Sequence, residues 1–169
     1  MPSPGYQLLM WNLPAEELRD LIGHEINVRE PDEWGDFALT VACHRLQRES
    51  VRMLLAAGAD PNVQNADGDT PLLCAIDCVH HNPSEAIEIV KLLASAGAQL
   101  ELRGYMDKTP FLKACSRGSL EMVKLLVQLK ADARATVNDL GGEVNGLGFA
   151  EIFNAPKDMQ QYLRGLHDA

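Results

Sequence analysis

The densest group of chemically versatile side chains lies in the stretch CAIDCVHHN, residues 74–82, where two cysteines precede a histidine pair. Thiolate and imidazole are ligands that zinc prefers, so a metal site could form from Cys74, Cys78, His80 and His81. A cysteine beside a histidine could also act as a nucleophile with its base. However, the spacing C-x3-C-x-H-H is not that of a common zinc module, and no third catalytic group is recognisable. We therefore predict no metal and no cofactor, and keep a metal- or redox-responsive regulator as the alternative function.

Other motifs of known chemistry are absent from the sequence. It contains no Gly-rich phosphate loop, no G-x-S-x-G elbow and no H-E-x-x-H. The two remaining cysteines, Cys43 and Cys115, each follow an alanine that recurs along the chain, which is typical of small core residues. The sequence therefore predicts a protein that is not an enzyme.

The charge of the chain disfavours two classes of partner. With 15 Lys and Arg against 24 Asp and Glu, the 169 residues carry a formal net charge of -9. Nucleic acid and anionic membranes would be repelled, whereas a protein with a basic surface patch would be attracted. The chain starts without a cleavable leader, and no stretch reaches the ~18 apolar residues of a membrane span. These features predict a cytoplasmic protein with free thiols. We also expect the chain to be a monomer on its own.

The elements that would position these residues follow from internal repetition. TPLLCA, residues 70–75, aligns with TPFLKA, residues 109–114, and similar apolar segments follow them, EIVKLLASAGAQ and EMVKLLVQLKAD. Weaker copies begin at FALTVA, residues 37–42, and at NGLGFA, residues 145–150. The alanine that closes each first block recurs at intervals of 33, 39 and 36 residues. The chain is therefore an array with a base period of 33 and insertions of six and three residues.

Each repeated unit has the signals of a helix pair. Thr70 and Thr109 can accept hydrogen bonds from the first turn of a helix, and the following prolines occupy the helical position that needs no donor. In the outer copies Asn145 can replace Thr, whereas Phe37 cannot, and we expect Asp36 to cap that helix instead. The recurrent alanine lets paired helices approach closely, and a leucine pair gives each second helix an apolar stripe.

These residues resemble the ankyrin repeat, whose signature is T-P-L-H-x-A followed by I-V-x-L-L and G-A-D-x-N. The resemblance runs from Pro31 to about Leu163 and implies an all-α solenoid of about five stacked helix-turn-helix units with short β-hairpin-like turns. It divides one domain, 1–169, into an N-terminal cap repeat, three repeats and a C-terminal cap repeat, with bounds 1–30, 31–64, 65–103, 104–137 and 138–169. We expect the degenerate N-terminal cap to contain two short helices broken at Pro14.

Two departures from the ankyrin pattern are informative. Lys130 replaces the glycine that ends the second helix elsewhere, as at Gly58 and Gly97, so a steric cost is expected there. The six-residue insertion follows the first helix of the third unit. We expect it to lengthen the connection between the helices or to add a turn to the first helix, and so to expose Asp77, Val79, His80 and His81.

The resemblance also implies which side chains face a partner. In the family these are the turn tips before each Thr-Pro and the residues just after the recurrent alanine. The tips carry Glu33, Trp34, Asp36, Asp67, Asp69, Tyr105, Met106 and Lys108, the inner helices carry His44, Arg45, Asp77, Ser116 and Arg117, and the insertion adds His80 and His81. Trp34 and Tyr105 are aromatic side chains of the kind that dominate interfaces, and acidic tips would speed encounter with a basic surface. Packing of the aromatic rings on neighbouring turns, and a merely solvated acidic face, are the alternative interpretations.

The predicted function is that of a non-catalytic protein-protein interaction module. It would bind one protein partner through its concave face and turn tips. Because the repeats nearly fill the sequence, binding itself would be the activity, so the module would inhibit or mask its partner. An inhibitor or a toxin-neutralising immunity protein would fit this description.

Overall fold

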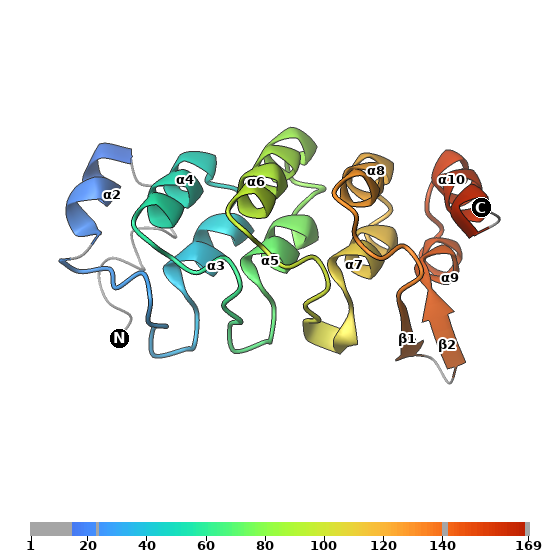
Figure 1. Cartoon of the computed structure of the whole chain (residues 1–169), viewed down its shortest axis with the longest axis horizontal. Coiled ribbons are helices and arrows are strands. Elements are labelled where there is room, and N and C mark those ends of the chain that lie inside the picture. The colour runs from blue at the N-terminus through green and yellow to red at the C-terminus, as the bar shows by residue number, and fades with distance from the viewer. Residues whose placement is uncertain (1–14, 23, 140–141, 168–169) are drawn as a thin grey trace.

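The computed structural model describes residues 15–22, 24–139 and 142–167. Its helices lie in two rows, an upper and a lower one in Figure 1. The outer row consists of α2 (Ala15–Leu21), α4 (Arg48–Ala56), α6 (Pro83–Ser95), α8 (Leu120–Gln128) and α10 (Lys157–His167). The inner row, which adjoins the turns, consists of α3 (Ala38–His44), α5 (Pro71–Asp77), α7 (Pro110–Ser116) and α9 (Gly146–Ile152). The predicted all-α solenoid of stacked helix pairs is confirmed, while the helix expected before Pro14 lies outside the described residues.

Three turn tips project beyond the inner helices and have the same backbone closure. In the first tip (32–36), second tip (65–69) and third tip (104–108), the N–H of the first residue donates to the carbonyl of the fifth, at N···O distances of 2.8, 3.1 and 3.1 Å. The last repeat instead has a short antiparallel hairpin of β1 (Thr136–Asp139) and β2 (Gly142–Asn145). The third tip also contains a 3-10 turn, η1 (Tyr105–Asp107).

The inner helices begin largely as their sequences predict. The hydroxyls of Thr70 and Thr109 each accept a hydrogen bond from the backbone N–H three residues on, and Asn145 caps α9 in the same way. The prediction that Asp36 caps α3 is wrong. The hydroxyl of Thr40 accepts from the N–H of Phe37 and donates to its carbonyl, while the Asp36 carboxylate accepts from Asn65 Nδ2 at 3.2 Å. A hydroxyl inside the first turn therefore replaces the side-chain cap.

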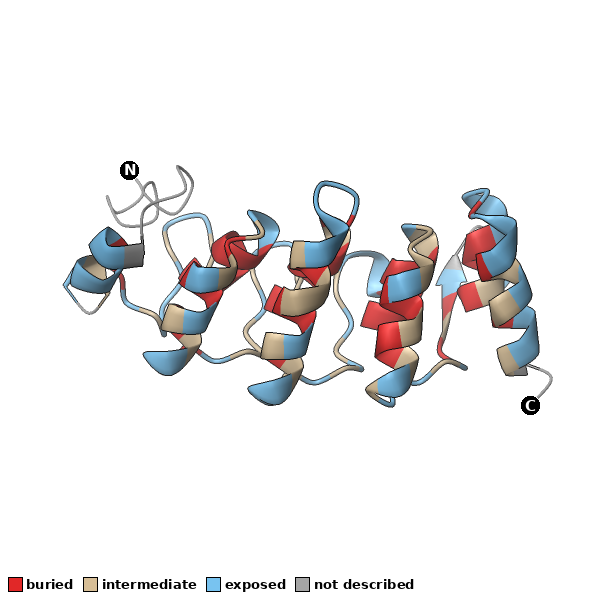
Figure 2. Ribbon diagram, turned by 90° about the horizontal axis from the view of Figure 1, so that it is seen from above, coloured by how far each residue is buried: buried red, intermediate tan, exposed pale blue. Residues whose placement is uncertain are grey.

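The core runs along the array. Buried residues occur in every layer of Figure 2, where neighbouring helices meet. The four recurrent alanines have no exposed surface, which lets the helices approach closely, and Cys43 and Cys115 beside two of them are buried as expected. Among the described residues, no helix has the length and apolar character needed to cross a membrane.

The six-residue insertion is divided between a loop and a helix. The inner helix α5 has seven residues, like α3 and α7, so of the two expected alternatives the added turn of the inner helix is wrong. The connection 78–82 is two residues longer than 45–47 or 117–119, and α6 has 13 residues where α4 and α8 have nine. Val79 is buried, contrary to expectation, whereas His80 and His81 are exposed.

Candidate functional site

The turn tips and inner helices enclose a series of hollows along one face of the array. The N-terminal hollow, of about 260 Å³, lies between the first and second tips and is lined by Asp36, Thr40, Val41, His44, Arg45, Asn65, Asp67 and Cys74. The C-terminal hollow, of about 530 Å³, is lined by Asp67, Asp69, Asp77, Tyr105, Met106, Lys108, Lys113, Ser116, Arg117 and Phe153. Asp67 belongs to both hollows. Most of the predicted binding residues are thus brought together on one continuous surface.

The predicted binding residues differ in how far they reach the surface. Exposed side chains are those of Glu33, Trp34, His44, Arg45, Asp67, His80, His81, Tyr105, Met106 and Arg117, and half-buried ones are those of Asp36, Asp69, Asp77 and Ser116. Lys108, predicted at an exposed tip, is instead buried, with its ammonium 4.6 Å from the centre of the Phe149 ring and 5.6 Å from that of Phe153. The faces of these rings attract the cation, which folds the side chain inward.

A buried lysine that the sequence analysis did not single out organises the floor of the C-terminal hollow. Lys113 Nζ lies 2.8 Å from Asp69 Oδ2 and 3.1 Å from Asp77 Oδ1, and only 6 % of Lys113 is exposed. Arg117 Nε donates to the same oxygen of Asp77 at 3.1 Å. The network joins the second tip, α5 and α7, so three elements hold one another in place.

Electrostatics inside this network favour the charged forms. Burial alone would lower the pKa of Lys113, but the hydrogen bond and charge of Asp69, with the charge of Asp77, raise it. Burial likewise opposes ionisation of Asp77, yet the Arg117 hydrogen bond and the Lys113 charge outweigh it and lower the pKa of this carboxyl. Because each ion has its partner within hydrogen-bonding distance, the charges remain in a largely buried place.

The third tip is held in a strained backbone conformation. In the first two tips the fourth residue is a glycine with positive φ, Gly35 or Gly68, whereas the third tip has Met106 at φ 59° and Asp107 at φ 56°. Residues other than glycine seldom adopt this region and need support from their surroundings. Here Asp69 Oδ1 accepts from the N–H of Tyr105 at 2.9 Å, so the Lys113 network reaches the tip directly.

Close packing reinforces that connection. A Cβ added at Gly104 would lie only 2.1 Å from Asp69 Oδ1 and 2.5 Å from a methyl group of Leu73. Arg103 braces the other side of the tip, because its Nη1 donates to the carbonyl of Asp107 at 2.7 Å and to its carboxylate at 3.0 Å. The tip that presents Tyr105 is therefore fixed from both sides.

The cysteine and histidine cluster of residues 74–81 is not assembled as a ligand set. Cys74 and Cys78 are buried, and burial is the main reason that the pKa of each thiol is raised. His80 and His81 are exposed on the connection, and among the described residues no three His, Cys, Asp or Glu side chains are placed to hold a metal ion. Cys78 Sγ instead lies 3.6 Å from His44 Nδ1, beside a hollow of about 240 Å³ lined by His44, Arg45, Leu46, Cys78 and His81. The four residues are thus not gathered as a zinc-binding set, because both cysteines are buried whereas both histidines are exposed on the connection.

Two exposed hydrophobic residues at the end of α9 were also missed. Ile152 and Phe153 follow Ala150 at the same offset at which His44 and Arg45 follow Ala42. Applying the register rule to the last repeat would have identified them. A signal for Lys113 was also present, because it is a charged residue within the apolar block TPFLKA and such residues are buried only when paired.

Comparison with known proteins decides the family. A family profile described as "Ankyrin repeats (3 copies)" matches residues 11–103, more than half of the chain, and one described as "Ankyrin repeat" matches residues 107–135. The chain belongs to the ankyrin repeat family. Ankyrin repeats indicate a protein-protein interaction module, and proteins built from them are generally non-catalytic.

Individual relatives of this ankyrin repeat chain are much longer. A mouse protein named "Protein fem-1 homolog A-like" is 31% identical over 144 residues, which cover 84% of this chain and 21% of the relative. A putative ankyrin repeat protein of Rickettsia felis is 39% identical over 80 residues, or 47% of this chain and 35% of the relative. Human ankyrin repeat and SOCS box protein 16 is 40% identical over 100 residues, or 58% of this chain and 20% of the relative. The chain thus spans about a fifth to a third of these relatives.

Proposed function

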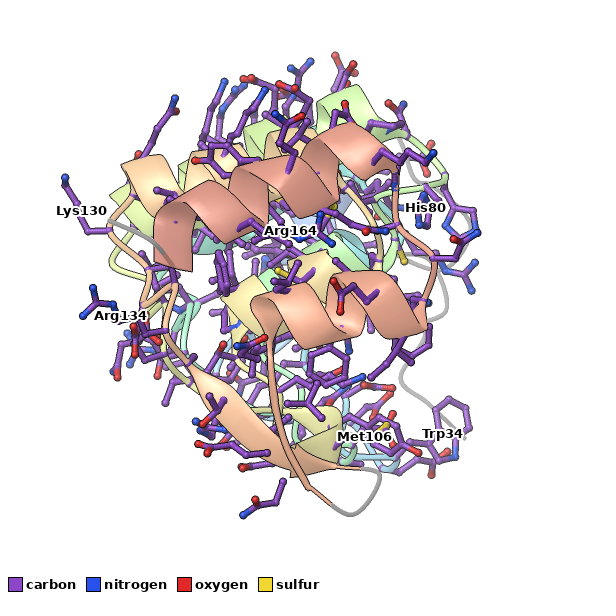
Figure 3. The ribbon with its side chains drawn as sticks, turned by 90° about the vertical axis from the view of Figure 1, so that its right-hand side faces the viewer. Trp34, His80, Met106, Lys130, Arg134 and Arg164 are labelled. Carbon is purple, nitrogen blue, oxygen red and sulfur yellow. The ribbon has the colours of Figure 1, made fainter. Side chains whose placement is uncertain are left out.

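We propose that this ankyrin repeat chain binds one protein partner through the face formed by its turn tips and inner helices, and that binding inhibits or masks that partner. The observation that carries the proposal is the gathering of exposed aromatic and polar side chains on a surface hollowed between the repeats. In Figure 3, Trp34, Met106 and His80 project on one side of the molecule, and Lys130 and Arg134 on the other. Large aromatic side chains at exposed tips are the residues on which interfaces depend most.

The charge of the chain supports a partner with a basic surface patch. Its net charge is -9, and Asp67, on the second tip between the two hollows, is exposed. Complementary charge speeds encounter and fixes orientation more than it adds to the final affinity. The proposal includes a cytoplasmic location, a monomeric free state, no nucleic-acid or membrane binding, and no catalytic step. An inhibitor or an immunity protein that neutralises a toxin is the kind of protein that we have in mind.

Partner capture followed by binding measurements tests this proposal. A partner is first identified by affinity capture from native extract, and its dissociation constant is then measured with Trp34→Ala and Arg45→Ala variants. We expect losses of about tenfold for Trp34→Ala and at least about threefold for Arg45→Ala, because these side chains lie on the proposed face. Arg134→Ala is the matched control for Arg45→Ala, since Arg134 projects on the opposite side in Figure 3. Unchanged affinity in both test variants, or a loss confined to Arg134→Ala, would place binding elsewhere.

The inhibitory part of the proposal needs its own measurement. The activity of the captured partner is assayed with increasing amounts of the chain, and we expect a stoichiometric loss. If the partner bound with full affinity but kept its activity, the proposed binding would stand and the proposed inhibition would be excluded.

A further inference from the structure

Three of the five large hydrophobic residues that are exposed in the described part of the chain line the C-terminal hollow. Tyr105 is 61% exposed, Phe153 55% and Met106 49%, and all three line this hollow from two different elements. Two aromatic rings and a thioether therefore surround a space of about 530 Å³, within the range of protein pockets that hold a ligand group. Exposed apolar groups that converge on a hollow mark an interaction site more often than scattered ones do.

The floor of the hollow adds little net charge. The cations Lys113 and Arg117 are bonded to Asp69 and Asp77, so these four charges compensate one another inside the site. The ammonium of Lys108, which also lines the hollow, lies against the Phe149 and Phe153 rings. The guanidinium of Arg117 is anchored by Asp77 while remaining partly exposed, and a guanidinium in a fixed plane can stack on an aromatic ring. A flat apolar guest would thus enter without separating an ion pair.

One carboxylate at the rim is available to a guest. The backbone N–H of Asp67 bonds to Asn65, but the Asp67 carboxylate makes no hydrogen bond or ion pair with another described residue. It stands on the second tip beside the hollow, and the negative charge of the whole chain adds to its own field. A basic group of a partner fits this position.

The rim is already in place before a guest arrives. The backbone at Met106 and Asp107 stays in the left-handed region because Asp69, Gly104 and Arg103 hold it there. Strain of this kind tends to occur where a site has to be preorganised. A rim that does not have to be ordered on binding avoids an entropic cost of association.

We propose, resting on the proposed function, that the C-terminal hollow receives an aromatic side chain of the partner whose neighbour in sequence is an arginine or lysine that pairs with Asp67. An aromatic guest is favoured over an aliphatic one because ring-ring and sulfur-ring contacts with Tyr105, Phe153 and Met106 add to simple burial. The partner segment is thus defined by an aromatic-basic pair of residues.

Short peptides provide a direct probe. Three blocked octapeptides, Ser-Gly-Ala-X-Z-Ala-Gly-Ser with X-Z as Trp-Arg, Trp-Glu or Ala-Arg, are titrated into the 15N-labelled full chain, and the amide shifts are followed by NMR. We expect the Trp-Arg peptide to shift amides of the third tip, Asp67, Arg117 and Phe153. It should bind about three- to tenfold more tightly than Trp-Glu at low salt, and at least about tenfold more tightly than Ala-Arg. Raising the salt to about 0.5 M should reduce the preference for Arg over Glu.

Variants of the chain show which residues bind the aromatic side chain of the peptide and which residue binds its basic side chain. Tyr105→Ala and Phe153→Ala should each weaken the Trp-Arg peptide about five- to tenfold, whereas Asp67→Asn should leave Trp binding and remove the preference for Arg over Glu. Ile152→Ala is the matched control, because Ile152 is similarly exposed next to Phe153 but does not line the hollow. Tyr105 is exposed at a tip, so its variant tests the rim even if Phe153→Ala perturbs Lys108. The proposal would be overturned if the Ile152 and Phe153 variants weakened binding equally, or if the peptide shifted amides outside the hollow. Equal affinity of the wild-type chain for Trp-Arg and Trp-Glu would also overturn it.

The same variants separate this proposal from the function on which it rests. The affinity of each variant for the identified partner is compared. If Trp34→Ala and Arg45→Ala lose affinity while Tyr105→Ala and Phe153→Ala do not, the proposed binding face is supported and the hollow is excluded. Full affinity in all four variants would exclude the binding face itself. Losses in both sets, together with the peptide result, would support both proposals.

Discussion

Lys113 is the residue at which the stability of the fold and the shape of the candidate site depend on the same contacts. Replacing it by methionine keeps most of its volume but leaves Asp69 and Asp77 facing each other without the ammonium between them. Removing one partner of a buried ion pair is strongly destabilising, so Lys113→Met should lower the free energy of unfolding by roughly 3 kcal/mol in urea denaturation at pH 7. Lys91→Met is the control, since Lys91 pairs with Glu88 on an exposed helix surface, where such pairs contribute about 0.5 kcal/mol or less. Equal losses in the two variants would show that the buried pairs contribute no more than surface pairs.

Two aspartates on this face should respond to pH in opposite ways. The folded pKa of Asp77 is lowered from its usual 3.8, so its stabilisation is complete above about that pH and is lost as the pH falls through the folded pKa. Asp77→Asn should therefore destabilise the protein by roughly 1–3 kcal/mol at pH 7, and the difference from the wild type should shrink below pH 3.8.

Asp36 is the charge-matched comparison. Burial raises the folded pKa of Asp36 above 3.8, so ionisation of this carboxyl opposes folding. The stability of the protein should therefore fall as the pH rises from 3.8 through the folded pKa. Asp36→Asn removes the same charge but should leave stability at pH 7 unchanged or slightly higher. Urea denaturation of both variants from pH 3 to 7 measures how the free energy of unfolding changes with pH in each. If both variants differed from the wild type in the same way at every pH, the loss of one negative charge, and not its position, would explain the effect.

The outer helices end at a glycine in two repeats and at a lysine in a third. Gly58 and Gly97 have φ values of 88° and 91°, and Lys130 takes the equivalent place after α8 with φ 74°. A side chain in this region is strained, so Lys130→Gly should stabilise the protein by about 0.5–1 kcal/mol, even though glycine gains more freedom in the unfolded chain.

Gly97→Ala is the reciprocal change. An added Cβ would meet no atom within 4 Å there, so its expected loss of about 1 kcal/mol comes from the backbone alone. Thermal and urea denaturation measure both effects. A destabilised Lys130→Gly variant would contradict the assignment of strain to this helix end.

Most elements could be predicted from the sequence because their signals are local. Thr-Pro at residues 70–71 and 109–110 defines where helices begin, and the 33-residue spacing defines which helices stack. The cap of α3 could not be predicted in the same way, because it depends on whether the hydroxyl of Thr40 turns back to the residue three positions before it. The repeat spacing also indicates that residues are inserted after the first helix of the third unit, but it does not predict how they divide between the loop and the longer α6.

At the scale of the whole molecule, the face along which the turn tips line up could be predicted, and the contacts inside it could not. Repetition places every tip on the same side, so the register of one repeat predicts the others. The contact of Lys113 with Asp69, by contrast, joins residues 44 positions apart on different units, and neither residue alone indicates the other. Lys108 was misplaced for the same reason, since the rings that draw it inward belong to the next repeat.

An array in which each layer contacts only its neighbours should unfold from its ends. The inner helices α5 and α7 have a layer on both sides, whereas α2 and α10 lie at the two ends of the described array, as Figure 1 shows. Native-state hydrogen exchange should therefore be slowest in α5 and α7 and faster toward both ends. Leu163 in α10 is 1% exposed, so its replacement by alanine should destabilise the last layer by about 2–3 kcal/mol. Exchange should then become faster in α9 and α10 and stay nearly unchanged in α3. Leu54→Ala in α4, equally buried, should give the reverse gradient. If either variant accelerated all helices equally, the array would unfold as one cooperative unit instead of layer by layer.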